Sequence, residues 1–147
     1  MIQGVERLSR ETTVPGYSKT PLAKKLGIKA GAEIHVVNGL DDYPELIAPL
    51  PEGAKFVSRL SNTTDLVHVF TSSKSELAKA LSSCRKKVKP DAMIWVSWPK
   101  KSSKVATDVT EDTVREIALP LGFVDVKVCA VTDVWSGLKL VIRKALR

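Results

Sequence analysis

The most restrictive feature of the sequence is a short connection near its C-terminus. Residues 123–131 and 138–142 both have the composition of β-strands, and only residues 132–137 lie between them. Parallel strands need a crossover of about a dozen residues or more, whereas a six-residue connection suits a hairpin. The last two strands are therefore expected to be antiparallel neighbours.

Upstream of this hairpin, apolar β-like runs alternate with helical segments. Strands are expected over residues 33–38, 54–57, 65–71 and 92–97, and helical segments over residues 21–26, over 42–48, after Ser73 and after Asp108. Ser73 and Glu76 have the spacing of a capping box, and Asp108 with Glu111 indicates another helix start. The apolar run of residues 93–96 suits a strand buried on both faces of a parallel sheet. The pattern predicts a three-layer α/β domain with a mostly parallel sheet that ends in an antiparallel hairpin.

The length and composition are those of one domain. The chain has 147 residues, of which 44% are hydrophobic and 27% charged, ordinary values for a chain that buries a core. Residues 1–16 lack a clear period and end in Pro15-Gly16, so we expect a flexible arm before a single domain over residues 17–147. The sequence lacks a signal core and any run near the ~18 apolar residues of a membrane span, so a cytoplasmic protein is expected.

Basic residues exceed acidic ones, which favours anionic partners. The net charge is +7, and the excess lies in residues 19–29, 85–89, 100–104 and 139–147. The basic run at residues 85–89 has an alternative explanation. It would suit the C-terminal end of a helix, because cations complement the unpaired backbone carbonyls there. We expect an anionic small molecule or a protein partner, with nucleic acid a weaker possibility and no membrane partner. The oligomeric state has no signal in the sequence.

The candidate binding site follows from the expected sheet. Ligands of open α/β sheets bind at the C-terminal ends of the parallel strands. That rule gathers residues that are distant in sequence, and we assign ligand binding to Asn38, Gly39, Ser97, Trp98, Lys100, Lys101, Trp135 and Ser136. Two indoles beside lysines would stack on a ring and neutralise a phosphate. The alternative is that both indoles cap the core and the lysines are solvated.

Catalytic and metal-binding residues have weaker signals. His35 and His68 each lie three residues before the end of an expected strand, so their rings could be adjacent and could bind a metal or transfer protons. We favour buried, hydrogen-bonded histidines and assign no metal, because a third ligand at a fitting spacing is missing. Ser97 lacks a Gly-x-Ser-x-Gly elbow, and Cys84 and Cys129 have neither a disulfide nor a zinc pattern. No residue is assigned a catalytic role.

Several longer motifs resemble known proteins. The strand order expected for such a hairpin is similar to class I methyltransferase Rossmann folds, in which the final strand inserts beside the fifth. The chain resembles more closely a family of short bacterial proteins classed as a domain of unknown function. The segments that carry this resemblance are GYSKTPLAKKLGIKAG, DLVHVF, WVSWPKKSSK, TEDTVREIALPLGFVDVKVCAV and WSGLKLVIRKALR. The resemblance runs from about Gly16 to the C-terminus and implies a Rossmann-like domain without implying an activity.

The cofactor signals of methyltransferases can be compared with the residues present. S-adenosylmethionine sites of that family use a glycine-rich turn after the first strand and an acidic residue after the second. Here the first turn contains one glycine, Gly39, and the second strand leads into Ser58 and Arg59. The cofactor therefore stays unassigned. We expect a non-catalytic Rossmann-like module that binds its partner at the C-terminal edge of the sheet; the alternatives are a divergent S-adenosylmethionine-dependent methyltransferase-like enzyme and a weak nucleic-acid binder.

Overall fold

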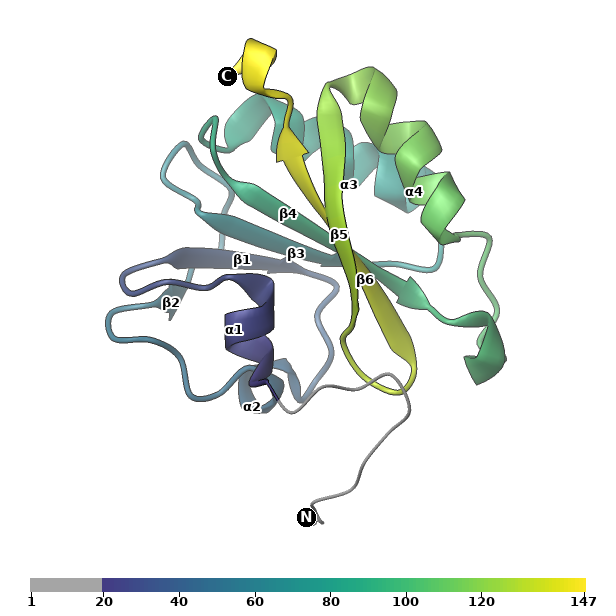
Figure 1. Ribbon diagram of the computed structural model, residues 1–147, viewed down its shortest axis with the longest axis horizontal. Coiled ribbons are helices and arrows are strands. Elements are labelled where there is room, and N and C mark those ends of the chain that lie inside the picture. The colour runs from purple at the N-terminus through teal and green to yellow at the C-terminus, as the bar shows by residue number, and fades with distance from the viewer. Residues whose placement is uncertain (1–19) are drawn as a thin grey trace.

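Six strands of the described chain form one sheet with helices on both sides (Figure 1). The computed structural model describes residues 20–147; the expected arm at residues 1–16 lies outside them. The helices are α1 (Leu22–Leu26), α2 (Tyr43–Leu46), α3 (Lys74–Lys87) and α4 (Glu111–Ala118), with 3-10 turns at Lys101–Ser103, Leu119–Leu121 and Lys144–Leu146. The strands are β1 (Glu33–Val37), β2 (Lys55–Phe56), β3 (Leu66–Phe70), β4 (Met93–Pro99), β5 (Phe123–Ala130) and β6 (Trp135–Ile142).

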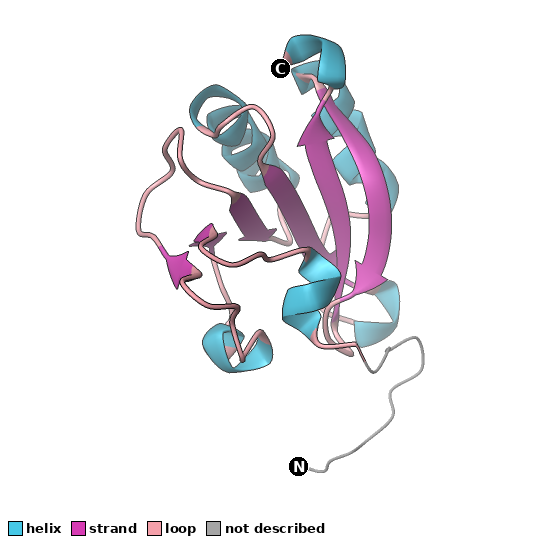
Figure 2. Ribbon diagram, turned by 60° about the vertical axis from the view of Figure 1, so that its left-hand side comes forward, coloured by secondary structure: helices cyan, strands magenta, loops and turns pink. Residues whose placement is uncertain are grey.

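The sheet has the order β2-β1-β3-β4-β6-β5. The first four of these strands are parallel, whereas β6 runs antiparallel between β4 and β5. Figure 2 shows β5 and β6 as a long curved pair beside the shorter parallel strands. The mostly parallel sheet with a terminal antiparallel hairpin is therefore confirmed. The hairpin connection is shorter than expected because β6 already begins at Trp135.

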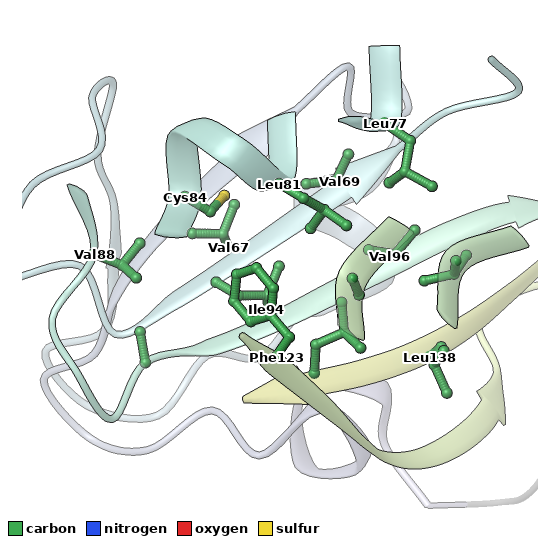
Figure 3. Packing of buried hydrophobic residues seen from close by; sticks show 14 of the residues in the cluster. Val67, Val69, Leu77, Leu81, Cys84, Val88, Ile94, Val96, Phe123 and Leu138 are labelled. Carbon is green, nitrogen blue, oxygen red and sulfur yellow. The ribbon is translucent and has the colours of Figure 1, made fainter. Parts of the chain in front are cut away.

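One core lies between the sheet and helices α3 and α4. Leu77, Leu81 and Cys84 of α3 are fully buried against alternate residues of the strands, and Figure 3 shows Cys84 beside Val67 and Leu81 beside Val69. Alternation along each strand places these residues on one side of the sheet, which we call the α3 side. Ser73 begins this helix as predicted, since its hydroxyl accepts a hydrogen bond from Glu76 N–H. The capping box is only half formed, because Ser73 N–H donates to the Thr71 hydroxyl and not to the Glu76 carboxylate.

A second core lies on the other side of the sheet, which we call the α1 side. It joins α1 and α2 to alternate residues of β1, β3 and β4 (Figure 1). Trp95 is fully buried there, and its indole N–H donates to the Leu26 carbonyl at 2.9 Å. Helix α1 ends at Gly27, whose φ of 83° is in the left-handed region that favours glycine.

The start of α4 differs from the sequence expectation. Thr110, and not Asp108, is the N-cap, and its hydroxyl accepts from Thr113 N–H. Asp108 instead accepts from Lys74 N–H at 2.8 Å and so caps the first turn of α3 from a distant loop. Both residues are common cap types, and the choice between them depends on how the loop crosses α3. None of the helices in the described part of the chain is long and apolar enough to cross a membrane.

Candidate functional site

The C-terminal ends of β1, β3 and β4 meet at one edge of the sheet, where β6 also begins. A tight turn follows β1: Asn38 has a φ of 55°, and a Cβ on Gly39 would lie 2.5 Å from Cγ1 of Val36. The turn leads into α2, whose first residue is Tyr43. The backbone after β1 therefore folds back onto its own strand within a few residues.

Tyr43 fills the space behind this turn. Its side chain is only 2% exposed and lies edge-on to the ring of Phe70, with 5.5 Å between the ring centroids. The Tyr43 hydroxyl lies 2.7 Å from Nδ1 of His68, and Nε2 of the same imidazole lies 2.7 Å from the Ser97 hydroxyl. Three polar side chains from α2, β3 and β4 thus form one continuous hydrogen-bonded chain under the edge.

Burial keeps these hydrogen-bonded side chains uncharged. His68 is fully buried, and the loss of water lowers its pKa from 6.5 to about 3. Burial also raises the pKa of Tyr43 well above its usual value of 10.0. Since both imidazole nitrogens have partners, the neutral ring satisfies its hydrogen-bonding capacity without water. This arrangement connects three elements of the fold through side chains that are all buried.

An aromatic layer extends from the buried chain to the surface. The His68 ring stacks on Phe70 with 4.2 Å between centroids, and Phe70 meets the half-buried Trp135 edge-on at 5.3 Å. Lys100 N–H donates to the Val134 carbonyl at 2.8 Å, which joins the loop after β4 to the start of β6. The indole of Trp135 therefore lies at a rim whose neighbouring loop carries lysines.

The predicted binding residues divide into an accessible and a buried set. Asn38, Gly39 and Lys101 are exposed, and Lys100, Trp135 and Ser136 are half-buried. Ser97 is fully buried with its hydroxyl bonded to His68, and Trp98 is 6% exposed within the core under α3 and α4.

The expectation that both indoles share one opening is wrong. Pro99 pairs with Trp135 and Trp98 with Ser136, so alternation puts Trp98 on the α3 side and Trp135 on the α1 side.

The possible histidine pair is also absent. Val36, and not His35, pairs with His68, so the two rings lie on opposite sides of the sheet. His35 Nδ1 lies 3.1 Å from the Val57 carbonyl instead. Within residues 20–147 no group of three or more histidine, cysteine, aspartate or glutamate side chains is arranged to hold a metal. Sequence reasoning missed the roles of Tyr43 and Phe70, because both look like ordinary core residues in the sequence.

Comparison with protein families gives one match over most of the chain. The model of the family described as protein of unknown function DUF3052 matches residues 52–144. The chain belongs to this family. None of the curated proteins matches it. Membership agrees with the resemblance in the sequence, although the matched region begins later than Gly16.

Solved structures share the fold at low sequence identity. A S-adenosylmethionine-dependent methyltransferase from Aquifex aeolicus has a TM-score of 0.64 at 16% identity, covering 95% of this chain and 97% of that one. The Methanococcus jannaschii fibrillarin pre-rRNA processing protein has a TM-score of 0.54 at 16% identity, covering 89% and 77%. A protein of the NADB-Rossmann superfamily from Streptococcus agalactiae has a TM-score of 0.55 at 14% identity, covering 86% and 69%. The chain thus has a class I methyltransferase-like Rossmann fold.

The residues present do not fit the cofactor that this fold implies. The turn after β1 runs so close to Val36 that a Cβ on Gly39 would clash with it, and the buried ring of Tyr43 lies behind the turn. Helix α2 has only four residues, so the long helix that normally presents its N-terminus to a ligand after the first strand is missing. Beyond β2, Ser58 and Arg59 are exposed, and neither is the acid that would accept hydrogen bonds from a ribose. We therefore derive no chemical step through S-adenosylmethionine.

Proposed function

We propose that this protein is a non-catalytic Rossmann-like module that binds a small anionic molecule at the C-terminal edge of its sheet. The observation that carries the proposal is the hydrogen bond from Lys100 N–H to the Val134 carbonyl, which holds a lysine-bearing loop beside the half-buried Trp135. An aromatic ring and ammonium groups together suit a ligand with a planar part and a negative charge.

The surroundings of Trp135 support this assignment. Its indole packs edge-on against Phe70, which in turn packs edge-on against Tyr43, so buried aromatic side chains support the indole ring. Residues 100–104 contain three lysines and no acid, so this loop contributes only positive charge to the rim. The turn at Asn38 and Gly39 adds solvent-exposed backbone and side-chain amide groups at the end of β1. These features provide stacking, charge and hydrogen bonding at one edge.

The buried polar chain supports a binding role over a catalytic one. Tyr43, His68 and Ser97 would be the natural acid, base and nucleophile at this edge, but all three are buried and bonded to one another. Burial moves the pKa values of Tyr43 and His68 away from neutrality, whereas a group that transfers protons works best with a pKa near the ambient pH. The hydrogen bonds among these three side chains therefore serve to hold the C-terminal edge of the sheet rigid.

Ligand binding can be tested with a panel of nucleotides, coenzymes and phosphorylated metabolites in thermal-shift and tryptophan-fluorescence titrations. Trp135 is the most accessible of the three tryptophans, so a ligand at this edge should quench its emission saturably. Lys100→Glu should weaken binding about tenfold or more, equivalent to roughly 1.4 kcal/mol. Lys79→Glu, an exposed charge reversal on α3, is the matched control.

Three outcomes would reject the proposal. They are no saturable binding by any member of the panel, equal weakening by both charge reversals, and binding only of an acidic peptide, which would make the edge a protein-docking surface.

The fold itself favours a second candidate, a divergent methyltransferase-like enzyme. Calorimetric titration with S-adenosylmethionine and its demethylated product tests this candidate, because saturable binding that Gly39→Val abolishes would establish a cofactor site at the turn after β1. A weak nucleic-acid binder would instead retain oligonucleotides only at low salt, since phosphate contacts release counterions. The calorimetric titration and the salt dependence of oligonucleotide binding are both separate from the titrations with the metabolite panel.

A further inference from the structure

A second basic region lies on the α1 side of the hairpin, away from the C-terminal edge. Lys127 of β5 pairs directly with Lys139 of β6, and Lys139 pairs with Trp95 of β4 on its other flank. Trp95 belongs to the core beneath α1, so both lysines belong to the α1 side. Figure 1 shows α1 in front of the parallel strands, and none of the helices within residues 20–147 lies in front of β5 and β6.

A third lysine approaches from the loop after α1. Burial, followed by the charges of Lys127 and Lys29, lowers the pKa of Lys139. The ammonium groups of Lys29 in the loop and of Lys127 on β5 therefore both repel that of Lys139 on β6. Opposing residues on adjacent strands have Cβ atoms about 5 Å apart, and like charges in such positions destabilise a sheet.

These three lysines lack counterions in the described structure. Across residues 20–147 the ion pairs join Lys89 to Asp65 and Arg115 to three carboxylates, and none includes Lys29, Lys127 or Lys139. Half-burial of Lys139 adds a desolvation cost to the repulsion. The free energy of this arrangement is raised by both effects, and a bound anion would remove the repulsion.

A cavity opens beside the lysines. Its volume is about 300 Å³, at the lower end of the range for small-molecule sites, and Lys29 and Met93 are among its walls. Met93 pairs with Val141, two residues along β6 from Lys139, so the cavity adjoins the lysines on the same side of the sheet. The ion pair of Lys89 with Asp65 also lines the cavity, together with Asp91.

We propose that this cavity and the three lysines Lys29, Lys127 and Lys139 form a binding site for a small phosphate monoester. The dianionic phosphate lies among the ammonium groups, and the remainder of the molecule occupies the cavity between Met93 and the Asp65–Lys89 pair. A phosphate suits the lysines better than a carboxylate because its second charge and third oxygen match three separate donors. The cavity favours a small molecule over a polymer, which would need a longer basic track.

The test is an NMR titration of the full chain with inorganic phosphate, adenosine 5′-monophosphate and uncharged adenosine. Amides of β5, β6 and the loop after α1 should shift saturably with the monophosphate and more weakly with phosphate, whereas adenosine should leave them unchanged. Lys127→Ala and Lys139→Ala should each weaken monophosphate binding about tenfold, equivalent to roughly 1.4 kcal/mol. Lys87→Ala, an exposed lysine at the end of α3, should bind as the parent does.

Several results would overturn the proposal. They are shifts confined to the C-terminal edge, equal binding of adenosine, no saturation by either phosphate probe, and variants that match Lys87→Ala. Binding of an oligonucleotide without binding of the monophosphate would instead make this surface a nucleic-acid contact. The location of the shifted amides separates this site from the one proposed at Trp135, so either proposal can fail alone.

Discussion

The hydroxyl of Tyr43 lies 2.7 Å from Nδ1 of His68, and this contact joins the segment after β1 to the middle of the sheet. Tyr43→Phe would keep the ring but leave a fully buried imidazole nitrogen without its partner. We expect the free energy of unfolding to fall by about 1–3 kcal/mol, measured by urea denaturation. Ser102→Ala, at an exposed position, should change it by less than about 0.5 kcal/mol. Equal effects of the two substitutions would contradict the role of the contact.

Stability should depend on pH through the same histidine. The folded-state pKa of His68 is about 3 and its ordinary value is 6.5, so the unfolded chain binds more protons between these values. The contribution of neutral His68 to the free energy of unfolding is therefore complete above pH 6.5. It is lost as the pH falls below that value, by up to about 1.4 kcal/mol per pH unit. Denaturation between pH 7 and about 4.5 measures this slope before most carboxylates titrate. Direct NMR titration should show no protonation of His68 in that window, and a midpoint near pH 6 would contradict the prediction.

Gly137 lies under the indole of Trp95. A Cβ at this position would be 3.0 Å from Cγ2 of Val131 and 3.3 Å from Cε3 of Trp95. Gly137→Ala should therefore overpack the core and lower the free energy of unfolding by about 1–3 kcal/mol. In a double-mutant cycle, Val131→Ala should recover part of this loss by removing the nearest contact, whereas strictly additive effects would show that the crowding lies elsewhere.

The two cysteines should differ in reactivity. Cys84 is fully buried in α3, and burial raises the pKa of its thiol to about 12. Burial also raises the pKa of Cys129, but this thiol is half-buried and the charges of Lys25 and Lys127 oppose the rise. A chromogenic disulfide reagent should therefore label one thiol of the native protein first, because the thiolate is the reactive form. Cys129→Ser should abolish this fast phase and Cys84→Ser should preserve it.

Local sequence patterns predicted the elements well where the deciding residues are neighbours. Ser73 begins α3 as expected because its cap bond reaches only to Glu76. The antiparallel ending followed from the short connection after residue 131, since chain length alone excludes a crossover. Asp108 failed as a cap of α4 because its carboxylate is used by Lys74 N–H, a contact between distant segments.

The errors at the site come from register. Alternation along one strand determines which of its own residues share a side of the sheet. A shift of one residue in the register between two adjacent strands changes which residues of the second strand lie on that side. Val36 pairs with His68, which separates His35 from His68. Pro99 pairs with Trp135 in the same way, which separates Trp98 from Trp135. Register depends on packing across the whole sheet, so the sequence of one strand does not contain it.

The position of β6 between β4 and β5 has a consequence for how the molecule is made. Residues Trp135–Ile142 leave the ribosome after β5, yet among the strands of residues 20–147 only β6 lies beside β5. Until the final strand inserts, β5 has no hydrogen-bonding neighbour and the side of β4 that receives β6 stays open. Completion of this sheet during synthesis must therefore wait until Ile142 has been made, and until then the growing polypeptide exposes an unpaired strand that chaperones can recognise.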